Sequence, residues 1–550
     1  MPLVENTLTK ITASRTSVPE ICLLPKPNSM TQYEGVFQLS AKTTVVASGR
    51  AQSTALFISD LLARSTGYSV PFVGDRPGTS TIELSLDSKC ATLGAEGYRL
   101  RITPTSVLIV AEEPAGLFYG FQTLLQLLPA AIYGSTPDPE RNWVIPCVDI
   151  VDTPRFDWRG AMLDVSRHFI PIPFLRKFID LLALHKLNIL HLHLNDDQGW
   201  RLEIKKYPKL TAVGAYRPET LVGRAMQDPC DKDYDQSKQD FDGIPHSGYY
   251  TQNQMRDLVK YAQTRHVRIV PEIEMPGHAQ AAVAAYPELG CTDTPPQVSK
   301  SWGIHPTLFN ASDETISFLK DVLTEVMDIF PSVDIHIGGD EAVKTQWKES
   351  AVCQQRIQEL GLNDEQGLQS WFIRQMDEFL TAHGRCLVGW DEILDGGLAP
   401  NATVMSWRGE EGGLAAAAIG HDVIMSDHEH TYLDYYQTQD RTTEPQAFPN
   451  TLTLSKVYGH DPIPVALAAE HAHHVLGAQG QLWTEYMPTT DQVEYQAFPR
   501  LCALAEVTWT DPDNKDFDNF IERLGAHFKR LDLLDVNYRP IELGEGGDHA

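Results

Sequence analysis

The 550-residue sequence lacks the features that mark membrane-spanning and nucleic-acid-binding proteins. No stretch approaches the roughly 20 consecutive apolar residues that a membrane span requires. Lysine and arginine number 45 against 73 aspartates and glutamates, which gives a formal net charge of −28. A negative field of this size repels nucleic acids and anionic membrane surfaces. We therefore expect a neutral partner, with no role for nucleic acid or membrane.

Cysteine is also scarce, and its spacing predicts no disulfide framework. The eight cysteines are widely scattered and form no C-x-x-C motif. A chain of this length can bury a large core without cross-links, so we expect mainly free or buried thiols. The first 20 residues lack the apolar core of a secretory signal. This predicts a cytoplasmic protein, or a secreted or periplasmic one if a leader has been removed.

Phosphate loops and helical zinc motifs are missing as well. The sequence contains neither G-x-G-x-x-G nor G-x-x-x-x-G-K-[ST], and no H-E-x-x-H. Segment 228–243 begins with the aspartate spacing of a calcium loop, but Gln236 stands where glycine is needed, so we interpret it as a solvated loop. His191 and His193 are interpreted as buried, hydrogen-bonded histidines. Metal-dependent hydrolysis through these histidines and Asp196 stays open as an alternative.

Residues 1–152 predict a small α+β domain. The β-rich stretches TTVVAS and TIELSL alternate with helical spacing of apolar residues at 51–66 and 115–132. A mixture of strands and helices in this order is typical of an α+β unit. The remaining chain, residues 153–550, has a different and more regular pattern.

From residue 153 onward, short apolar runs alternate with helical stretches or long loops. Eight such runs predict an α/β fold of the (β/α)8 TIM-barrel type. A doubly wound open sheet is the alternative, although no phosphate loop accompanies it. The runs are RGAMLDVS (159–166), NILHLHLND (188–196), VRIVPEIEMPGH (267–278), VDIHIGGDE (333–341), RCLVGWDEIL (385–394), ATVMSWRG (402–409), DVIMSDHEH (422–430) and LGAQGQLWTEY (476–486).

Nearly every run ends in polar or aromatic residues. Barrel enzymes carry their active sites at the C-terminal ends of the strands, where such groups converge. One strand end with an acid would carry no information, but eight together predict an active site. The groups are Ser166 and Arg167, Asp196 and Asp197, Glu274 and His278, Asp340 and Glu341, Trp390 with Asp391 and Glu392, Trp407 and Arg408, Asp427 and His428, and Trp483 with Glu485.

Asp340 and Glu341 lie side by side in HIGGDE (336–341). Adjacent carboxylates repel each other, so the arrangement needs a chemical reason. Ordinary glycosidases place two carboxyl groups roughly 5–10 Å apart across the bond that breaks. Neighbouring acids suit substrate-assisted hydrolysis better, because there the 2-acetamido oxygen of the sugar is the nucleophile. One acid orients that group, and the other protonates the leaving oxygen.

Three tryptophans support a sugar as the ligand. Trp390, Trp407 and Trp483 follow three different predicted strands. Indole rings stack on the apolar faces of a pyranose, while a few polar groups bind its hydroxyls. A single tryptophan would be interpreted as core packing, but three at one end of a barrel predict a sugar pocket.

HIGGDE resembles the signature of glycoside hydrolase family 20, the β-N-acetylhexosaminidases. Other segments are similar to motifs of this family, in order, across about 160–510, and the N-terminal unit resembles the small domain that commonly precedes its barrel. The resemblance implies an exo-acting, retaining enzyme that removes terminal N-acetylglucosamine, with N-acetylgalactosamine as a further candidate, from neutral glycans such as chito-oligosaccharides. It implies no metal and no organic cofactor, and it leaves monomer and homodimer open. The segments are LDVSRHFIP, HLHLNDDQGWR, PEIEMPGHAQAAVAAYPEL, GWDEIL, YLDYYQ and QLWTEY.

The resemblance also implies catalytic roles. Asp340 would orient and stabilise the acetamido group, and Glu341 would be first the general acid and then the general base. Asp196 and His278 would form a chain toward Glu341 that keeps it suited to proton donation.

Further roles implied by the resemblance concern substrate binding. Arg167 would hold ring hydroxyls through a fork that stays charged, and Asp434 and Glu485 would bind hydroxyls at the opposite rim. Tyr432 would donate a hydrogen bond to the acetamido oxygen. The three aromatic residues lining the pocket would be Trp390, Trp407 and Trp483.

Two positions depart from the family pattern, and two functional alternatives stay open. Many relatives have a tryptophan where this chain offers only Phe448, so we do not extend the predicted pocket there, and Glu274 replaces an aspartate. The enzyme could release a disaccharide unit instead of one sugar. An inactive carbohydrate-binding protein on the same barrel is the alternative from outside the enzymes.

Overall fold

The computed structural model describes residues 21–541 except 76–77, 226 and 228. Among these residues, contacts divide the chain into two compact units. The first comprises residues 21–23 and Ser29–Asp152, and the second comprises Leu24–Asn28 and the chain from Thr153 onward. Within the described residues, no helix combines the length and the apolar character that a bilayer span demands.

The first unit is a six-stranded mixed sheet with two long helices, which confirms the predicted small α+β domain. Its strands lie in the order β1-β6-β4-β5-β3-β2. The predicted helices at 51–66 and 115–132 are α1 and α2. The elements are β1 (Ser29–Gln38), β2 (Thr44–Ala47), α1 (Gln52–Thr66), β3 (Thr81–Leu86), β4 (Tyr98–Ile102), β5 (Ser106–Ala111), α2 (Pro114–Leu127) and β6 (Val144–Asp152).

The second unit contains a closed barrel of eight parallel strands, as the sequence predicts, so the alternative of an open sheet is wrong. The strands are mostly buried and largely apolar because helices cover them outside and side chains fill the barrel inside. All seven residues of β7, for example, are buried. The strands are β7 (Trp158–Asp164), β8 (Ile189–His193), β13 (Arg268–Glu272), β14 (Asp334–His336), β15 (Cys386–Trp390), β16 (Thr403–Ser406), β17 (Val423–Met425) and β20 (Val475–Leu482).

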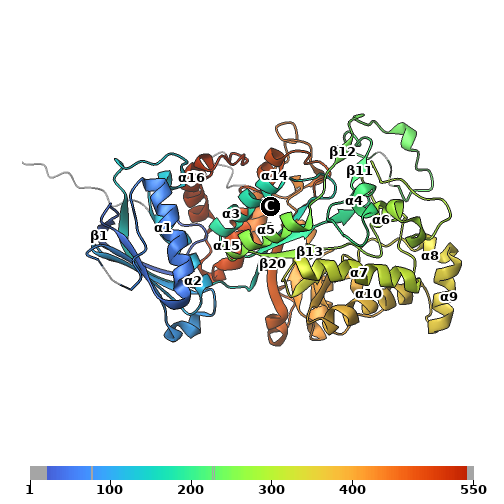
Figure 1. Cartoon of the computed structure of the whole chain (residues 1–550), viewed down its shortest axis with the longest axis horizontal. Helices are drawn as coiled ribbons and strands as arrows, with labels where there is room; N and C mark the ends of the chain where they lie inside the picture. The colour runs from blue at the N-terminus through green and yellow to red at the C-terminus, as the bar shows by residue number, and fades with distance from the viewer. Residues whose placement is uncertain (1–20, 76–77, 226, 228, 542–550) are drawn as a thin grey trace, which may run out of the picture. The chain divides into compact units, whose positions relative to one another are not determined.

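Helices follow the barrel strands and pack around them (Figure 1). They are α3 (Ile172–Leu184), α4 (Lys209–Ala212), α5 (Gln252–Gln263), α6 (Gln280–Ala285), α7 (Asp313–Ile329), α8 (Thr345–Glu349), α9 (Ala351–Leu360), α10 (Glu365–Ala382), α11 (Glu411–Ala418), α12 (His428–Thr431), α13 (Leu454–Gly459), α14 (Thr490–Ala497), α15 (Arg500–Trp509) and α16 (Phe517–Leu533). Short strand pairs lie outside the barrel: β9 (Asn195–Asp196) with β10 (Gly199–Trp200), β11 (Tyr216–Arg217) with β12 (His246–Ser247), and β18 (Tyr435–Tyr436) with β19 (Phe448–Thr451).

Local sequence fixes where several of these helices begin. Thr251 and Gln254 form a capping box at the start of α5, since each side chain accepts a hydrogen bond from the other residue's backbone N–H. Ser312 accepts a hydrogen bond from the backbone N–H of Thr315 and so caps α7. The apolar face of α7 is buried, and the helix lies beside α10 on the outside of the barrel (Figure 1).

Candidate active site

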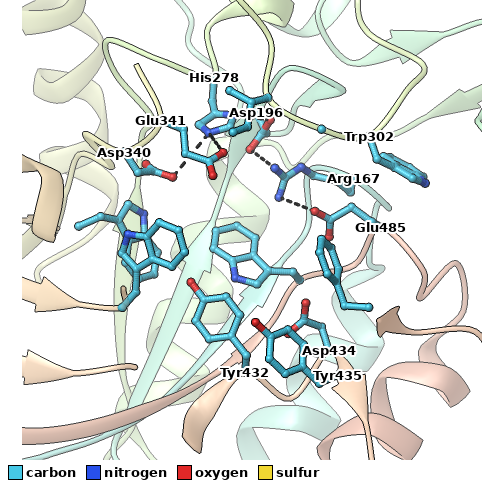
Figure 2. Close-up of a pocket in the computed structure, with 16 residues that line it drawn as sticks. Arg167, Asp196, His278, Trp302, Asp340, Glu341, Tyr432, Asp434, Tyr435 and Glu485 are labelled. Atoms are coloured by element: carbon cyan, nitrogen blue, oxygen red, sulfur yellow. Dashed lines mark ion pairs between the residues drawn. The ribbon is translucent and has the colours of Figure 1, made fainter. Parts of the chain in front are cut away.

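A pocket of about 330 Å³ opens at the C-terminal ends of the barrel strands (Figure 2). This volume is at the small end of the range for small-molecule sites. All eleven side chains that the sequence singles out for the site line it: Arg167, Asp196, His278, Asp340, Glu341, Trp390, Trp407, Tyr432, Asp434, Trp483 and Glu485. The structure therefore brings together residues from segments more than 300 positions apart.

The turn after β14 holds Asp340 and Glu341 at the edge of the pocket. Gly338 and Gly339 have φ values of 69° and 99°, in the region that favours glycine. A Cβ atom on Gly338 would lie 1.6 Å from a carboxylate oxygen of Glu274. Glu341 itself has a φ of 45°, which is rare for a residue with a side chain. The glycines are therefore needed both for the turn and for the close approach of Glu274.

His278 lies between the two acids of this turn and two further aspartates (Figure 2). Its Nε2 atom is 3.5 Å from Asp340 Oδ2 and 3.4 Å from Glu341 Oε2. Its Nδ1 atom is 3.3 Å from Asp196 Oδ1 and 3.1 Å from Asp197 Oδ2. Burial alone would lower the pKa of His278, but the Asp196 carboxylate and hydrogen bonds raise it well above its usual value. The predicted contact of Asp196 and His278 is present, and Asp197 joins it.

A second histidine extends this network into the barrel. His193 Nε2 is 3.0 Å from Asp196 Oδ2, and His193 Nδ1 is 2.6 Å from Glu272 Oε2. Glu272 also accepts a hydrogen bond of 2.9 Å from Trp390 Nε1. Burial would lower the pKa of His193, but the Glu272 and Asp196 carboxylates raise it to about 10. Trp390 is thus connected to His278 through Glu272, His193 and Asp196.

Arg167 occupies the other end of the pocket, where it faces several carboxylates. Its Nη2 atom lies 2.8 Å from Asp196 Oδ2, and its Nη1 atom lies 3.3 Å from Asp164 Oδ2 and 3.7 Å from Glu485 Oε1. Burial alone would lower the pKa of Arg167, but Asp196, Glu485 and Asp164 raise it well above its usual value. One guanidinium therefore balances several acids at this end.

Three buried carboxylate oxygens in the pocket have no hydrogen-bond partner: Asp340 Oδ1, Asp434 Oδ1 and Glu485 Oε2. Burial raises the pKa of Asp434 well above its usual value, and the Glu485 carboxylate raises it further. Buried acceptors without donors are costly in a finished structure. In a pocket they mark the places where a ligand presents N–H or O–H groups.

Aromatic side chains form the remaining lining. Trp390 and Trp483 have ring centroids 5.8 Å apart, and Trp407 stacks on Tyr432 with centroids 6.1 Å apart. Trp407 Nε1 donates a hydrogen bond of 2.9 Å to Glu392 Oε2. Burial and the nearby Asp340 carboxylate raise the pKa of Glu392 to about 8. Stacked rings over a floor of hydrogen-bonding groups suit a ligand with an apolar face and polar edges.

Several residues of the site were not assigned a role from the sequence. Phe448 lines the pocket, so the prediction that stopped short of this position is wrong. Trp302 also lines it, on a loop that carries no motif. Asp197 and Glu392 each follow a strand and stand next to a residue that was assigned a role. Their place at the end of a strand could have indicated that they belong to the site. Glu272 stands inside its strand, where no strand-end signal exists.

The histidines and acids weighed as metal ligands have partners within the protein. His191 and His193 are fully buried; His191 Nδ1 is 2.9 Å from Gln479 Nε2 and His193 Nδ1 is 2.6 Å from Glu272 Oε2, as expected for hydrogen-bonded core histidines. Asp235, in the acidic loop 228–243, accepts hydrogen bonds from the backbone and the side chain of Ser237. Position 228 of that loop lies outside the described residues.

Comparison with known proteins gives two family matches. Residues 156–512 match the catalytic domain of glycosyl hydrolase family 20, and residues 20–153 match domain 2 of the same family. A β-hexosaminidase of Porphyromonas gingivalis is 43% identical over 97% of this chain and 67% of its own length.

Solved structures agree with this similarity. A family 20 β-N-acetylhexosaminidase of Streptomyces coelicolor superposes with a TM-score of 0.81 at 32% identity, over 96% of this chain and 98% of that one. An exo-β-N-acetylglucosaminidase of Vibrio harveyi, solved in complex with N-acetylglucosamine, has a TM-score of 0.80 at 30% identity, over 94% of this chain and 78% of that one.

Proposed function

The chain belongs to glycosyl hydrolase family 20, and we propose that it hydrolyses terminal non-reducing N-acetylglucosamine residues from neutral glycans by substrate-assisted catalysis. It is a glycoside hydrolase of the β-hexosaminidase type. The finer proposal concerns the bond that it cleaves, the origin of the nucleophile and the size of the released product.

The observation that carries the proposal is the arrangement of unpartnered acceptors in the pocket. Asp340 Oδ1 lies at one end, beside Glu341, and Asp434 Oδ1 and Glu485 Oε2 lie at the other. A 2-acetamido sugar carries an amide N–H near its reacting carbon and hydroxyl groups on the opposite edge. Such a sugar supplies donors at both ends, whereas a sugar without the acetamido group leaves Asp340 without one.

The proposed reaction uses the acetamido oxygen as the nucleophile. This oxygen attacks the anomeric carbon as the glycosidic C–O bond breaks, and Glu341 gives its proton to the leaving oxygen. Asp340 accepts the amide N–H and stabilises the positive charge that develops on the cyclised group. Water then attacks the same carbon and loses its proton to Glu341. This attack opens the five-membered ring that the acetamido group had formed. Two displacements at one carbon leave the β configuration unchanged.

Trp302 supports the release of one sugar at a time. It lies beyond Arg167, on the side away from Asp340 (Figure 2). Only 3% of Trp302 is exposed, and its ring packs against His168 with centroids 5.5 Å apart. A second sugar on the non-reducing side would have to displace this packed ring. Chromatography of products from a chito-oligosaccharide should therefore show monosaccharide first and no disaccharide released from the non-reducing end.

The decisive test compares 4-nitrophenyl β-N-acetylglucosaminide with the matching β-glucoside. Rapid release of nitrophenol from the first and almost none from the second is expected, because only the first substrate carries its own nucleophile. Equal rates would mean that the protein supplies the nucleophile and would overturn the roles proposed for the two acids. Tight glycan binding without hydrolysis would favour the binding-protein alternative, and loss of activity with chelators would favour the metal-dependent one.

A further inference from the structure

Asp427, His430 and His460 form a second cluster of metal-binding side chains, outside the residues that line the pocket. Asp427 follows β17 and precedes α12, and His430 lies within α12. His460 is the residue directly after α13. One ligand atom from each residue lies within 4.8 Å of the other two. The cluster therefore connects two helices that are about 30 residues apart in the sequence.

Two polar atoms of this cluster are buried and have no hydrogen-bond partner. They are Asp427 Oδ2 and His460 Nε2, which lie 3.9 Å apart. That separation is too long for a direct hydrogen bond. Their side chains are only 4% and 2% exposed, so bulk water does not satisfy them. Buried polar groups without partners are rare in native proteins and point to an unseen ligand.

The third member gives the cluster both a fixed geometry and an entry route. His430 Nδ1 is 2.8 Å from Asp427 Oδ1, and its ring stacks on His460 with centroids 4.8 Å apart and an angle of 18°. The His430 side chain is 29% exposed, whereas the other two are buried. A small ion could reach the two unpartnered atoms past this histidine.

The two lysines near the cluster do not pair with Asp427. Lys456 pairs with Glu429 at 3.3 Å, and Lys515 Nζ donates a hydrogen bond of 3.0 Å to the His460 carbonyl. A neutral imidazole is the form of histidine that binds a metal.

We propose that Asp427, His430 and His460 bind a zinc ion, with water as the fourth ligand. Two imidazoles and one carboxylate are a ligand set that zinc favours and that magnesium and calcium do not. Binding through His430 Nδ1 would break its hydrogen bond to Asp427, and the Nδ1 proton would move to Nε2 of the same ring, because a metal ligand must offer a free lone pair. The ion would join α12 to α13. One of its ligands, His430, is two residues before Tyr432, which lines the pocket. Its role is structural, and the hydrolytic reaction does not require it.

Another histidine cluster shows what a satisfied arrangement looks like. His185 and His527 are joined through their Nε2 atoms at 2.9 Å. His185 Nδ1 is 2.7 Å from the carbonyl of Leu181, and His527 Nδ1 is 3.2 Å from Arg530. The four ring nitrogens are thus occupied by protein partners. No atom there awaits a ligand, so we assign no metal to that cluster.

The test begins with the full chain, stripped of metal by a chelator and dialysed. Titration with zinc chloride, followed by calorimetry, should show one tight site. The thermal midpoint should rise by about 2–3 °C at a hundredfold excess over Kd, since only the folded chain offers the site. Calcium and magnesium should cause no such rise.

Two variants and one matched control complete the test. Asp427→Asn and His460→Phe should weaken zinc binding by more than the about 10–100-fold that loss of an outer-shell partner costs. Asp422→Asn is the control, because Asp422 Oδ1 forms a comparable pair, 3.1 Å long, with His474 Nδ1 near the barrel. Equal zinc affinity in all the proteins, or no tight site in the parent chain, would overturn the proposal. A thermal shift that Asp422→Asn abolishes would place the site elsewhere.

Discussion

The two ends of the pocket both crowd carboxylates together, but they balance the charge in different ways. At the acid end, His278 lies between Asp196 and the pair Asp340 and Glu341, with contacts of 3.3–3.5 Å. At the other end, which we call the hydroxyl end, Arg167 contacts Asp196 and Glu485. The pKa of His278 is raised well above its usual value, but an imidazolium can still pass a proton to a neighbouring acid, whereas a guanidinium keeps its protons.

This difference separates the end that transfers protons from the end that binds the sugar hydroxyls. The acid end must deliver and recover a proton in each turnover, and its histidine leads to a buried network that holds positive charge. The hydroxyl end must keep its carboxylates ionised and oriented while neutral hydroxyls come and go. Asp196 belongs to both ends, since it contacts His278 and Arg167 at once. Changes at the acid end should therefore alter the rate most, and changes at the hydroxyl end should alter both stability and affinity.

The largest loss is expected from Glu341→Gln. The variant cannot protonate the leaving oxygen, so kcat/KM for substrates with alkyl leaving groups should fall about 10²–10⁴-fold. Activated aryl leaving groups need less protonation and should be hydrolysed with a smaller loss. Steady-state kinetics over a series of leaving groups measures the difference. Asp340→Asn is the companion variant and should lose activity with every leaving group, because it weakens the nucleophile instead. Identical profiles for both variants would contradict the division of roles.

Arg167→Met should break the hydroxyl end. Removing the guanidinium leaves Asp164, Asp196 and Glu485 without their shared cation, and uncovering a buried charge costs about 3–5 kcal/mol. The thermal midpoint should fall, and KM should rise strongly. Arg167→Lys retains the charge without the fork, so it should recover part of the stability and little of the affinity. Denaturant unfolding and Michaelis kinetics test both variants. A stable Arg167→Met with unchanged KM would show that the carboxylates do not depend on it.

The sequence predicted the barrel and the positions of its strand-end residues because both signals are local. Eight apolar runs have strand length, and a polar group directly after a run lies at the C-terminal rim in any closed parallel barrel. Nine of the strand-end residues line the pocket, and Tyr432 and Asp434, which the family resemblance added, line it as well. The catalytic roles, in contrast, came from the resemblance to a family and not from the pattern itself.

The buried network was not predictable because it depends on register. Glu272 lies opposite His193 on β8 and opposite His336 on β14, and only the closed barrel fixes these pairs. Each residue alone looks like a polar interruption within an apolar strand. Trp302 and Phe448 were missed for another reason. Trp302 reaches the pocket from a loop and Phe448 from the start of the short strand β19 outside the barrel, and no periodic pattern describes either path.

Glu272→Gln should lower kcat by less than the variants above, because it acts on the acid end only through His193. The substitution removes the anion that helps raise the pKa of His193 to about 10, so His193 should lose its proton at lower pH. The cation beside Asp196 then disappears within the working range. A cost of about 1–2 kcal/mol in the transition state corresponds to about a 5- to 30-fold lower kcat, with little change in KM. The alkaline limb of the pH profile should also move to lower pH.

The neighbouring acid supplies a matched control for that variant. Burial, Asp340 and Glu272 raise the pKa of Glu274 well above its usual value. Glu274 Oε1 lies 4.0 Å from His193 Nδ1, against 2.6 Å for Glu272 Oε2, so Glu274→Gln should move the alkaline limb less than Glu272→Gln does. Stability provides a second check, because the stabilisation from a protonated His193 is complete below about pH 6.5 and is lost as the pH rises toward 10. If Glu272→Gln leaves the pH profile unchanged, His193 has no part in positioning Asp196.

The smallest effect is expected from Glu392→Gln and grows as the pH rises. Burial and Asp340 raise the pKa of Glu392 to about 8 in the folded chain. Since the ordinary value is near 4.5, the unfolded chain loses this proton first, and the fold is destabilised as the pH rises from about 4.5 to about 8. Glutamine keeps an acceptor for Trp407 Nε1 and stays neutral. The variant should match the parent in thermal midpoint near pH 4.5, gain on it up to about pH 8, and exceed it in kcat at pH 9. If kcat of both proteins declines in parallel above pH 8, another group causes the decline. Trp407→Phe is the control, because it removes the hydrogen-bond donor and keeps the acid.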